Sequence, residues 1–341
     1  MHAEPIGILS AGAYVPRTSL SAADLAERTG VPEAVIRDKF GIEARPIPGE
    51  GDHTGAMGLW AAQDAVARAG IDPGEIDLVL CTTEEHKEYP LWTAGIKLAH
   101  DLGARKAWAI DVQLRCGTTM AALRMAKAMM RSEPGIRTAL IAGGYRNCDF
   151  VDLANPRSRF LTNLSAGGGA LLLRRGHPRS ELLGSSVITD GSFSLDVIVP
   201  VGGTVEPLTP DNFDRHYLDV PDPEGMKGRL DRLSMANFLR VIDEALAASD
   251  LGRGDIGFLN ILHMKRSAHE YILGQLGLGP EQTIYLSRYG HIGQQDQPLS
   301  YKLAEDQGRL RDGTIMVMVA AGIGYAWSAS VIRYGDAEAA R

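Results

Sequence analysis

Apolar and polar residues in the first half of the chain are arranged in blocks that predict strands and helices in turn. Short apolar runs bounded by charged or turn residues predict buried strands, and longer stretches with helical periodicity predict helices. We expect strands at residues 6–13, 76–83, 106–110, 137–144 and 165–173. We expect helices from residue 21 and at residues 32–40, 54–69, 92–102 and 119–130. This alternation predicts an α/β fold.

A similar order of elements returns in the second half. Strands are expected at residues 256–262, 284–290 and 314–320, and helices at residues 267–276 and from residue 298. Cys116 and His291, each at a predicted turn from strand to helix, lie 175 positions apart, and Thr138 and Thr314, at the start of two strands, lie 176 apart. These offsets predict two duplicated α/β halves, at residues 1–175 and 176–341.

Residues 200–229 interrupt the repeat. They are rich in Pro, Gly and Asp and show little periodicity. We therefore expect a long surface excursion, in a position to cover a substrate entrance.

The composition narrows the class of protein. Hydrophobic residues make up 45% and charged residues 23%, which are values typical of globular proteins, and the net charge of −7 argues against a general nucleic-acid binder. The three cysteines are far apart and show no metal or disulfide spacing, which suits a reducing cytoplasm. With no signal peptide and no apolar run of about 20 residues, we expect a cytoplasmic protein with no membrane contact and no metal.

Cys116 is the first candidate for chemistry. It lies where a predicted strand passes into the helix at 119–130, and Gly117 follows it. The positive end of a helix dipole favours the thiolate, which is the nucleophilic form. A lone buried cysteine is more often an ordinary core residue, so its role depends on what the second half places beside it.

His263 and His291, both at the ends of predicted strands, supply the imidazoles that a thiol nucleophile needs. In acyl transfer through a thioester, a thiolate attacks, an imidazole moves protons and backbone amides stabilise the oxyanion. Asp296 is placed to orient an imidazole in a Cys-His-Asp arrangement, although a loop aspartate is more often a turn residue. Five other histidines are expected to be ordinary surface or capping residues: His86, His100, His177, His216 and His269.

Several stretches, in this order and spacing, resemble the ketoacyl-acyl-carrier-protein (ACP) synthase III family of the thiolase superfamily over nearly the whole chain. The matching stretches are residues 40–45, 111–117, 165–170, His263, 289–290 and 321–327. The resemblance implies a five-layer αβαβα thiolase fold, a homodimer and a Cys-His-Asn active site. It maps the nucleophile onto Cys116, the catalytic histidine onto His263, and the oxyanion-hole amides onto the backbones of Cys116 and Ile323.

The sequence departs from the condensing members of that family at the site itself. His291 stands where those members have an asparagine whose amide helps to stabilise the enolate left by decarboxylation. One such donor is worth about 2.7–4 kcal/mol. An imidazole can also donate, but unlike an amide it can accept a proton from an alcohol, which favours ester formation. This pattern resembles the ester-forming and acyl-shuttling branch of the family, which includes malonyltransferases of antibiotic pathways.

Basic residues near the predicted site are candidates for substrate binding. Arg115, Lys265 and Arg266 would hold a malonyl carboxylate or, equally, pair with local acids. Lys39 falls where the family contacts the phosphates of coenzyme A, although Val35 stands where the family has a stacking tryptophan.

We therefore expect an acyltransferase of antibiotic or polyketide biosynthesis. It would move an acyl group, malonyl among the candidates, from a coenzyme A or ACP thioester through acyl-Cys116 to a hydroxyl or a carrier thiol. These thioesters would be co-substrates, with no bound cofactor. The alternatives are a decarboxylating 3-oxoacyl-ACP synthase III that makes a carbon–carbon bond, a non-catalytic partner subunit, and a hydrolase.

Overall fold

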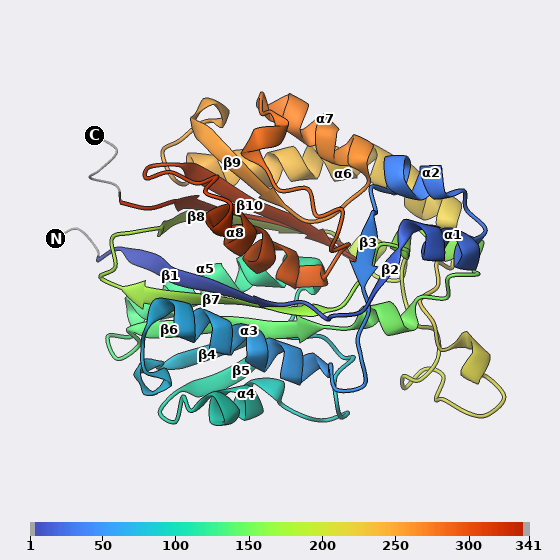
Figure 1. The fold of residues 1–341 in the computed structure, drawn as a ribbon, viewed down its shortest axis with the longest axis horizontal. Helices are drawn as coiled ribbons and strands as arrows, with labels where there is room; N and C mark the ends of the chain where they lie inside the picture. The colour runs from blue at the N-terminus through green and yellow to red at the C-terminus, as the bar shows by residue number, and fades with distance from the viewer. Residues whose placement is uncertain (1–3, 337–341) are drawn as a thin grey trace.

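A computed structural model describes residues 4–336. The first half contributes β1 (Ile6–Tyr14), β4 (Leu78–Thr82), β5 (Trp108–Val112), β6 (Thr138–Tyr145) and β7 (Gly167–Arg175). The second half contributes β8 (Glu181–Thr189), β9 (Ile256–Ile261), β10 (Ile315–Gly322) and β11 (Ala326–Arg333). These form one nine-stranded sheet in the order β5-β4-β6-β7-β1-β8-β11-β10-β9 (Figure 1). A small separate ladder pairs β2 (Ser19–Ser21) with β3 (Ala44–Pro46).

The two sets of strands have the same pattern of neighbours. In the first, β4 is parallel to β6, and β7 is antiparallel to both β6 and β1. In the second, β9 is parallel to β10, and β11 is antiparallel to both β10 and β8. The sets join at one register pair, Gly7 with Glu181. Boundaries for the duplication at 1–175 and 176–341 stay a prediction.

The helices form three layers around these strands, as Figure 1 shows. Their bounds are α1 (Ala22–Thr29), α2 (Glu33–Val35), α3 (Thr54–Ala69), α4 (Ala94–Leu102), α5 (Thr118–Ser132), α6 (Pro223–Ala247), α7 (Arg266–Leu276) and α8 (Asp296–Asp306). α3 and α4 cover the first set of strands and α6 and α7 the second, whereas α5 and α8 contact strands of both. The predicted five-layer αβαβα arrangement is confirmed. No helix within residues 4–336 is long and apolar enough to cross a membrane.

Burial explains why these strands could be recognised in the sequence. Every residue of β4 and of β6 is buried, as expected for parallel strands covered on both faces by helices. α5 turns Met120, Leu123, Ala126 and Met130 into the same core. This packing fixes the start of α5, and with it the position of Cys116.

The strand predicted at residues 284–290 is wrong. The residues on either side of it form isolated bridges, Thr283 to Leu259 of β9 and His291 to Leu164. The following residues fold into turns, in which the amide of Gly290 donates to the carbonyl of Leu286 at 3.0 Å. Ile284 and Leu286 are buried, so the apolar pattern came from core packing without strand pairing.

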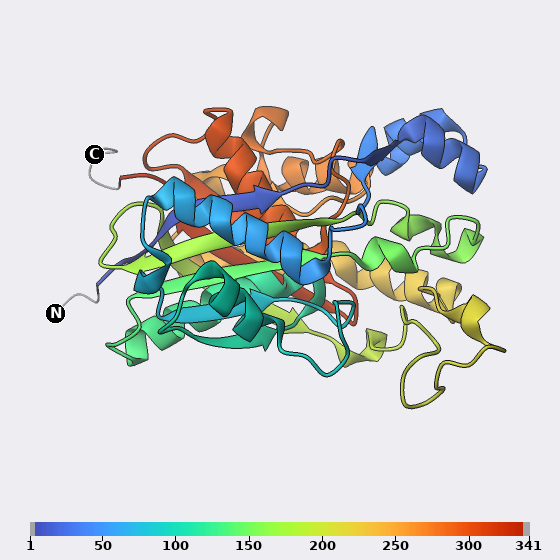
Figure 2. The same ribbon diagram turned by 60° about the horizontal axis from the view of Figure 1, so that its bottom comes forward.

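The excursion predicted at residues 200–229 is shorter than expected, because α6 begins at Pro223. Proline suits the first turn of a helix, where its missing N–H has no helical partner. The Asp222 side chain caps this end by accepting a hydrogen bond from Gly225 N at 2.9 Å. The segment before α6 lies at the end of the molecule remote from both termini (Figure 2).

Candidate active site

Cys116 lies in a single 3₁₀ turn, Arg115–Gly117, that leads directly into α5. Its side chain is 8% exposed. The end of β10 packs on this turn so closely that a Cβ at Gly322 would lie 2.9 Å from the backbone nitrogen of Cys116. Only glycine fits there, and the thiol is thereby held between the start of α5 and the end of β10.

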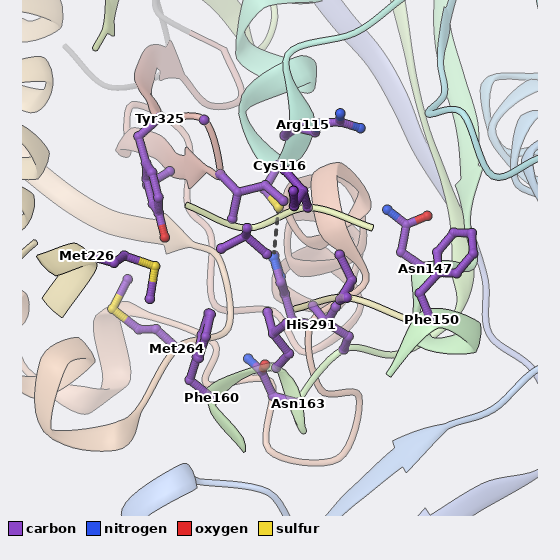
Figure 3. Close-up of a pocket in the computed structure, with 18 of the residues that line it drawn as sticks. Arg115, Cys116, Asn147, Phe150, Phe160, Asn163, Met226, Met264, His291 and Tyr325 are labelled. Carbon is purple, nitrogen blue, oxygen red and sulfur yellow. Dashed lines mark hydrogen bonds between the residues drawn. The ribbon is translucent and has the colours of Figure 1, made fainter. Parts of the chain in front are cut away.

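His291 contacts Cys116, as Figure 3 shows, and also contacts a buried carboxylate. Its Nε2 lies 3.1 Å from Cys116 Sγ, and its Nδ1 lies 2.6 Å from Asp296 Oδ2. Asp296 is fully buried and is itself fixed, because its Oδ1 accepts a hydrogen bond from Ile292 N at 2.7 Å and its Oδ2 one from His263 N at 2.8 Å. The structure therefore assembles a Cys-His-Asp geometry from the residues singled out in the sequence.

The charge of His291 follows from its two neighbours. Burial lowers the pKa of its imidazole, but attraction to Asp296 and to Cys116, together with both hydrogen bonds, raises the pKa well above its usual value. This shift favours the protonated imidazole in the free enzyme. Acylation of Cys116 removes its interaction with the ring, so the pKa of His291 then falls.

His263 is also buried, but both of its ring nitrogens face other partners. Nδ1 lies 3.1 Å from Asn163 Nδ2, and Nε2 lies 3.2 Å from the carbonyl oxygen of Gly41. Asn163 donates to Nδ1, so Nε2 carries the proton and donates to Gly41. Burial lowers the pKa of His263 to about 4, which keeps the ring neutral.

A cavity of about 1100 Å³ opens in front of these residues. Cys116, His263 and His291 all line it. Much of the rest of its wall is apolar and comes from Phe40, Phe150, Phe160, Val197, Met226, Leu230, Met235, Phe238, Met264 and Tyr325. This volume is at the upper end for small-molecule sites, roughly 300–1,000 Å³, and leaves room for far more than a short acyl group.

Arg115 does not offer a free positive charge. Its guanidinium lies 2.5 Å from a carboxylate oxygen of Glu85 and 3.4 Å from one of Glu84, and it extends away from His291 (Figure 3). Burial raises the pKa of Glu84, although Arg115 and a 2.5 Å hydrogen bond from Asn147 oppose that rise. Of the two roles left open by the sequence, the structure supports pairing with local acids.

The other predicted basic contacts lie apart from the thiol. Lys265 is exposed and lines the cavity. Arg266 instead stacks on the ring of Tyr285, with its guanidinium carbon 4.6 Å from the ring centroid. Lys39 is exposed and does not line the cavity, although its neighbour Phe40 does. Roles for these residues in substrate binding stay predictions.

Ile323 lines the same cavity as Cys116, directly after the glycine that packs on the nucleophile's turn. This places the two backbone stretches proposed for the oxyanion hole side by side. No cluster of three or more metal-binding side chains occurs within residues 4–336.

Sequence reasoning missed several residues of the site. These residues act through contacts between distant parts of the chain, and nothing in their local sequence identifies them as site residues: Glu84, Asn147 and Asn163. Of the five histidines expected to be ordinary surface or capping residues, His269 is buried, so that prediction was wrong for it. His86 and His216 are partly exposed and line the cavity.

Comparisons with known proteins agree with this architecture. The family model for 3-oxoacyl-[acyl-carrier-protein] synthase III matches residues 110–191, and the model for the C-terminal part of the same enzymes matches residues 246–334. Together they cover half of the chain. The β-ketoacyl-[acyl-carrier-protein] synthase III of Symbiobacterium thermophilum is 28% identical over 350 residues, covering 98% of this chain and 100% of the relative.

Solved structures show the same fold. The 3-oxoacyl-[acyl-carrier-protein] synthase III of Aquifex aeolicus superposes with a TM-score of 0.83 at 21% identity, covering 96% of this chain and 100% of that one. The priming β-ketosynthase of the R1128 polyketide pathway has a TM-score of 0.83 at 22% identity, covering 98% and 97%. At this identity the likeness establishes the predicted thiolase fold.

Proposed function

Because the chain belongs to the 3-oxoacyl-ACP synthase III family, we propose that it uses the family's cysteine for acyl transfer to a hydroxyl or carrier thiol. Family membership itself supports a transferase that either condenses acyl units or moves an acyl group. The observation that carries the proposal is the hydrogen-bonded series of Cys116, His291 and Asp296.

In the first half-reaction, the Cys116 thiolate attacks the carbonyl carbon of an acyl thioester on coenzyme A or ACP. The backbone amides of Cys116 and Ile323 stabilise the resulting oxyanion. The carbon–sulfur bond to the donor then breaks, and protonated His291 gives its proton to the departing thiolate. The products are acyl-Cys116, a free donor thiol and neutral His291.

In the second half-reaction, the oxygen or sulfur atom of the acceptor attacks acyl-Cys116, and neutral His291 accepts the proton that the acceptor loses. The tetrahedral intermediate collapses with release of the Cys116 thiolate, and the product is an ester, or a new thioester when the acceptor is a thiol. Asp296 stabilises the imidazolium formed in this step and holds its ring in place. The free enzyme is thereby restored.

The geometry is less suited to decarboxylative condensation. That reaction needs two side chains that donate hydrogen bonds to one enolate oxygen. His291 is held by Asp296 and faces the thiol, and His263 donates to the carbonyl of Gly41. Condensation therefore remains the alternative, and it would require His263 to exchange its partner.

The identity of the acyl group is a separate point. The sequence left open whether Arg115 holds a malonyl carboxylate or pairs with local acids, and Glu84 and Glu85 already neutralise its side chain. The exposed Lys265 at the cavity remains a candidate for that contact. The proposal retains the expected homodimer, cytoplasmic location and role in antibiotic or polyketide biosynthesis, the last supported by the similarity to a priming ketosynthase.

Intact-protein mass spectrometry tests the proposal. The enzyme is incubated separately with malonyl-coenzyme A and acetyl-coenzyme A, and then with both, while CO₂ release is measured. An adduct on Cys116 that passes to an added alcohol without CO₂ release is expected. An acetyl adduct alone, with malonyl consumed and CO₂ released when both donors are present, would identify a condensing enzyme.

A further inference from the structure

Tyr325 is held unusually firmly at the wall of the cavity. Its backbone N–H donates to Asp190 O at 3.0 Å, and its carbonyl accepts from Asp190 N at 2.8 Å. Its ring packs against the buried rings of Phe193 and Trp327, with centroid separations of 5.1 and 5.7 Å. The position of its hydroxyl is therefore fixed before any ligand binds.

That hydroxyl has no hydrogen-bond partner among residues 4–336, and Tyr325 lines the cavity. Two other tyrosines use theirs: Tyr285 donates to Met264 O at 2.9 Å, and Tyr14 donates to Asp52 at 2.6 Å. Burial raises the pKa of Tyr325, so its hydroxyl keeps its proton at neutral pH and can both donate and accept.

Apolar side chains lie beside the hydroxyl, and one buried carboxylate, that of Asp196, is close enough to raise its pKa. In Figure 3 it points into the cavity towards Met226, with Met264 and Phe160 nearby. A fixed hydroxyl on an apolar wall selects strongly for a ligand that supplies a matching polar atom, because a ligand without one leaves the hydroxyl unpaired.

We propose that Tyr325 determines acceptor specificity by binding a second oxygen of the acceptor. The preferred acceptor then carries at least two oxygen functions on a compact apolar frame, with one hydroxyl at His291 and the other at Tyr325. This inference rests on the proposed transfer to a hydroxyl, and it names the class of alcohol that the same site selects.

Tyr145 is the competing candidate. It also lines the cavity, and its ring centroid lies 6.3 Å from that of His291. Its side chain is only 4% exposed, and its ring packs directly on Gly293, so it presents less surface to a ligand. Tyr325 is therefore the better-placed hydroxyl.

The test uses cyclohexanol and the 1,2-, 1,3- and 1,4-cyclohexanediols, which share one apolar ring and differ in the spacing of the second hydroxyl. Enzyme acylated at Cys116 is mixed with each alcohol, and the second-order rate of ester formation is expressed per hydroxyl. At least one diol should exceed cyclohexanol by about 3- to 10-fold, the range for one hydrogen bond. Tyr325→Phe should remove this preference and leave both cyclohexanol transfer and the acylation of Cys116 unchanged.

Two matched variants control for the loss of a hydroxyl as such. Tyr285→Phe, whose hydroxyl is already paired with the backbone, should keep the diol preference, and so should Tyr145→Phe. The inference is overturned if no diol is preferred, if the preference survives in Tyr325→Phe, or if Tyr145→Phe removes it. Failure of the proposed function has a different signature: no alcohol discharges acyl-Cys116, and CO₂ is released when malonyl-coenzyme A is added to the acyl-enzyme.

Discussion

The two imidazoles of the cavity, His291 and His263, differ in charge although both are buried and both contact Asp296. The carboxylate reaches the ring of His291 at 2.6 Å, but it reaches only the backbone N–H of His263, at 2.8 Å. Burial lowers both pKa values, and only His291, with Asp296 and Cys116 against its ring, has a pKa well above the usual value. The direct partner of the ring, and not burial, decides which histidine can exchange protons with a substrate.

The largest effect is expected when the Cys116 thiol is removed, rather than when either histidine is changed. Cys116→Ala should abolish the acyl-enzyme, because the Cys116 thiol is the group that His291 Nε2 contacts. Intact-protein mass spectrometry after incubation with an acyl-coenzyme A measures the adduct. Cys148→Ala, which removes a buried thiol that does not line the cavity, should retain it. Turnover at the wild-type rate by Cys116→Ala would end the covalent mechanism.

Removal of the charge on Asp296 should make His291 more like His263. Asp296→Asn keeps the shape of the side chain but loses the attraction that raises the pKa of His291. We expect the rate of transfer to fall by about 10²- to 10⁴-fold, as when a triad carboxylate is replaced by an amide. Circular dichroism checks the fold, because Asp296 also accepts from two backbone amides. Near-normal transfer in a folded variant would show that the carboxylate has no such role.

The two imidazoles should also make the free energy of unfolding depend on pH in opposite directions. In the folded chain His263 has a pKa of about 4, below its unfolded value near 6.5. The unfolded chain therefore binds the proton more readily, and the free energy of unfolding falls as pH drops from 6.5 towards 4. The loss from this one group is on the order of 3 kcal/mol. The raised pKa of His291 instead contributes stability that is complete below pH 6.5 and is lost as pH rises through its folded pKa.

Denaturant unfolding at pH 4.5, 5.5 and 6.5 measures this difference. His263→Asn should flatten the loss on the acid side. His269, whose pKa burial also lowers to about 4, gives a matched variant, His269→Asn, with a similar but separate effect. An acid-side slope that is unchanged in His263→Asn would contradict a buried neutral ring at that position.

The smallest effect is expected at Arg115. Glu84 and Glu85 already neutralise the charge of Arg115. Arg115→Gln should therefore change the ratio of malonyl to acetyl loading by less than about fivefold. This change corresponds to an ion pair with the malonyl carboxylate worth at most about 1 kcal/mol. Competition between the two donors, resolved by mass spectrometry, measures the ratio. A selective loss of malonyl loading would return Arg115 to the role of carboxylate holder.

The site could be predicted to the extent that it depends on local sequence. Cys116 lies at a recognisable turn from strand to helix. Asp296 follows His291 by five residues and begins α8, so the two members of this ion pair are close together in the sequence. The contacts of Asn163 with His263 and of Glu84 with Arg115 join segments 100 and 31 residues apart. Only the folded chain brings these side chains together.

The fold shows the same limit. Buried strands such as β4 were found because their apolar runs are flanked by charge. The segment 284–290 has a similar apolar pattern but no second strand to pair with, and the difference lies in the tertiary environment. The start of α6 was missed because its first residues include proline and glycine. Pro223 is favourable at a helix N-terminus but unfavourable within a helix, so its presence in the sequence did not indicate a helix.

The most direct test of His291 as the base is a single-turnover chase of acyl-Cys116 by cyclohexanol. Wild type and His291→Asn are first loaded with the acyl group, and loss of the adduct and gain of the ester are followed by mass spectrometry. We predict that His291→Asn still becomes acylated but discharges to the alcohol far more slowly. Discharge of the loaded variant to cyclohexanol at the wild-type rate would contradict the assignment of His291 as the base for the acceptor.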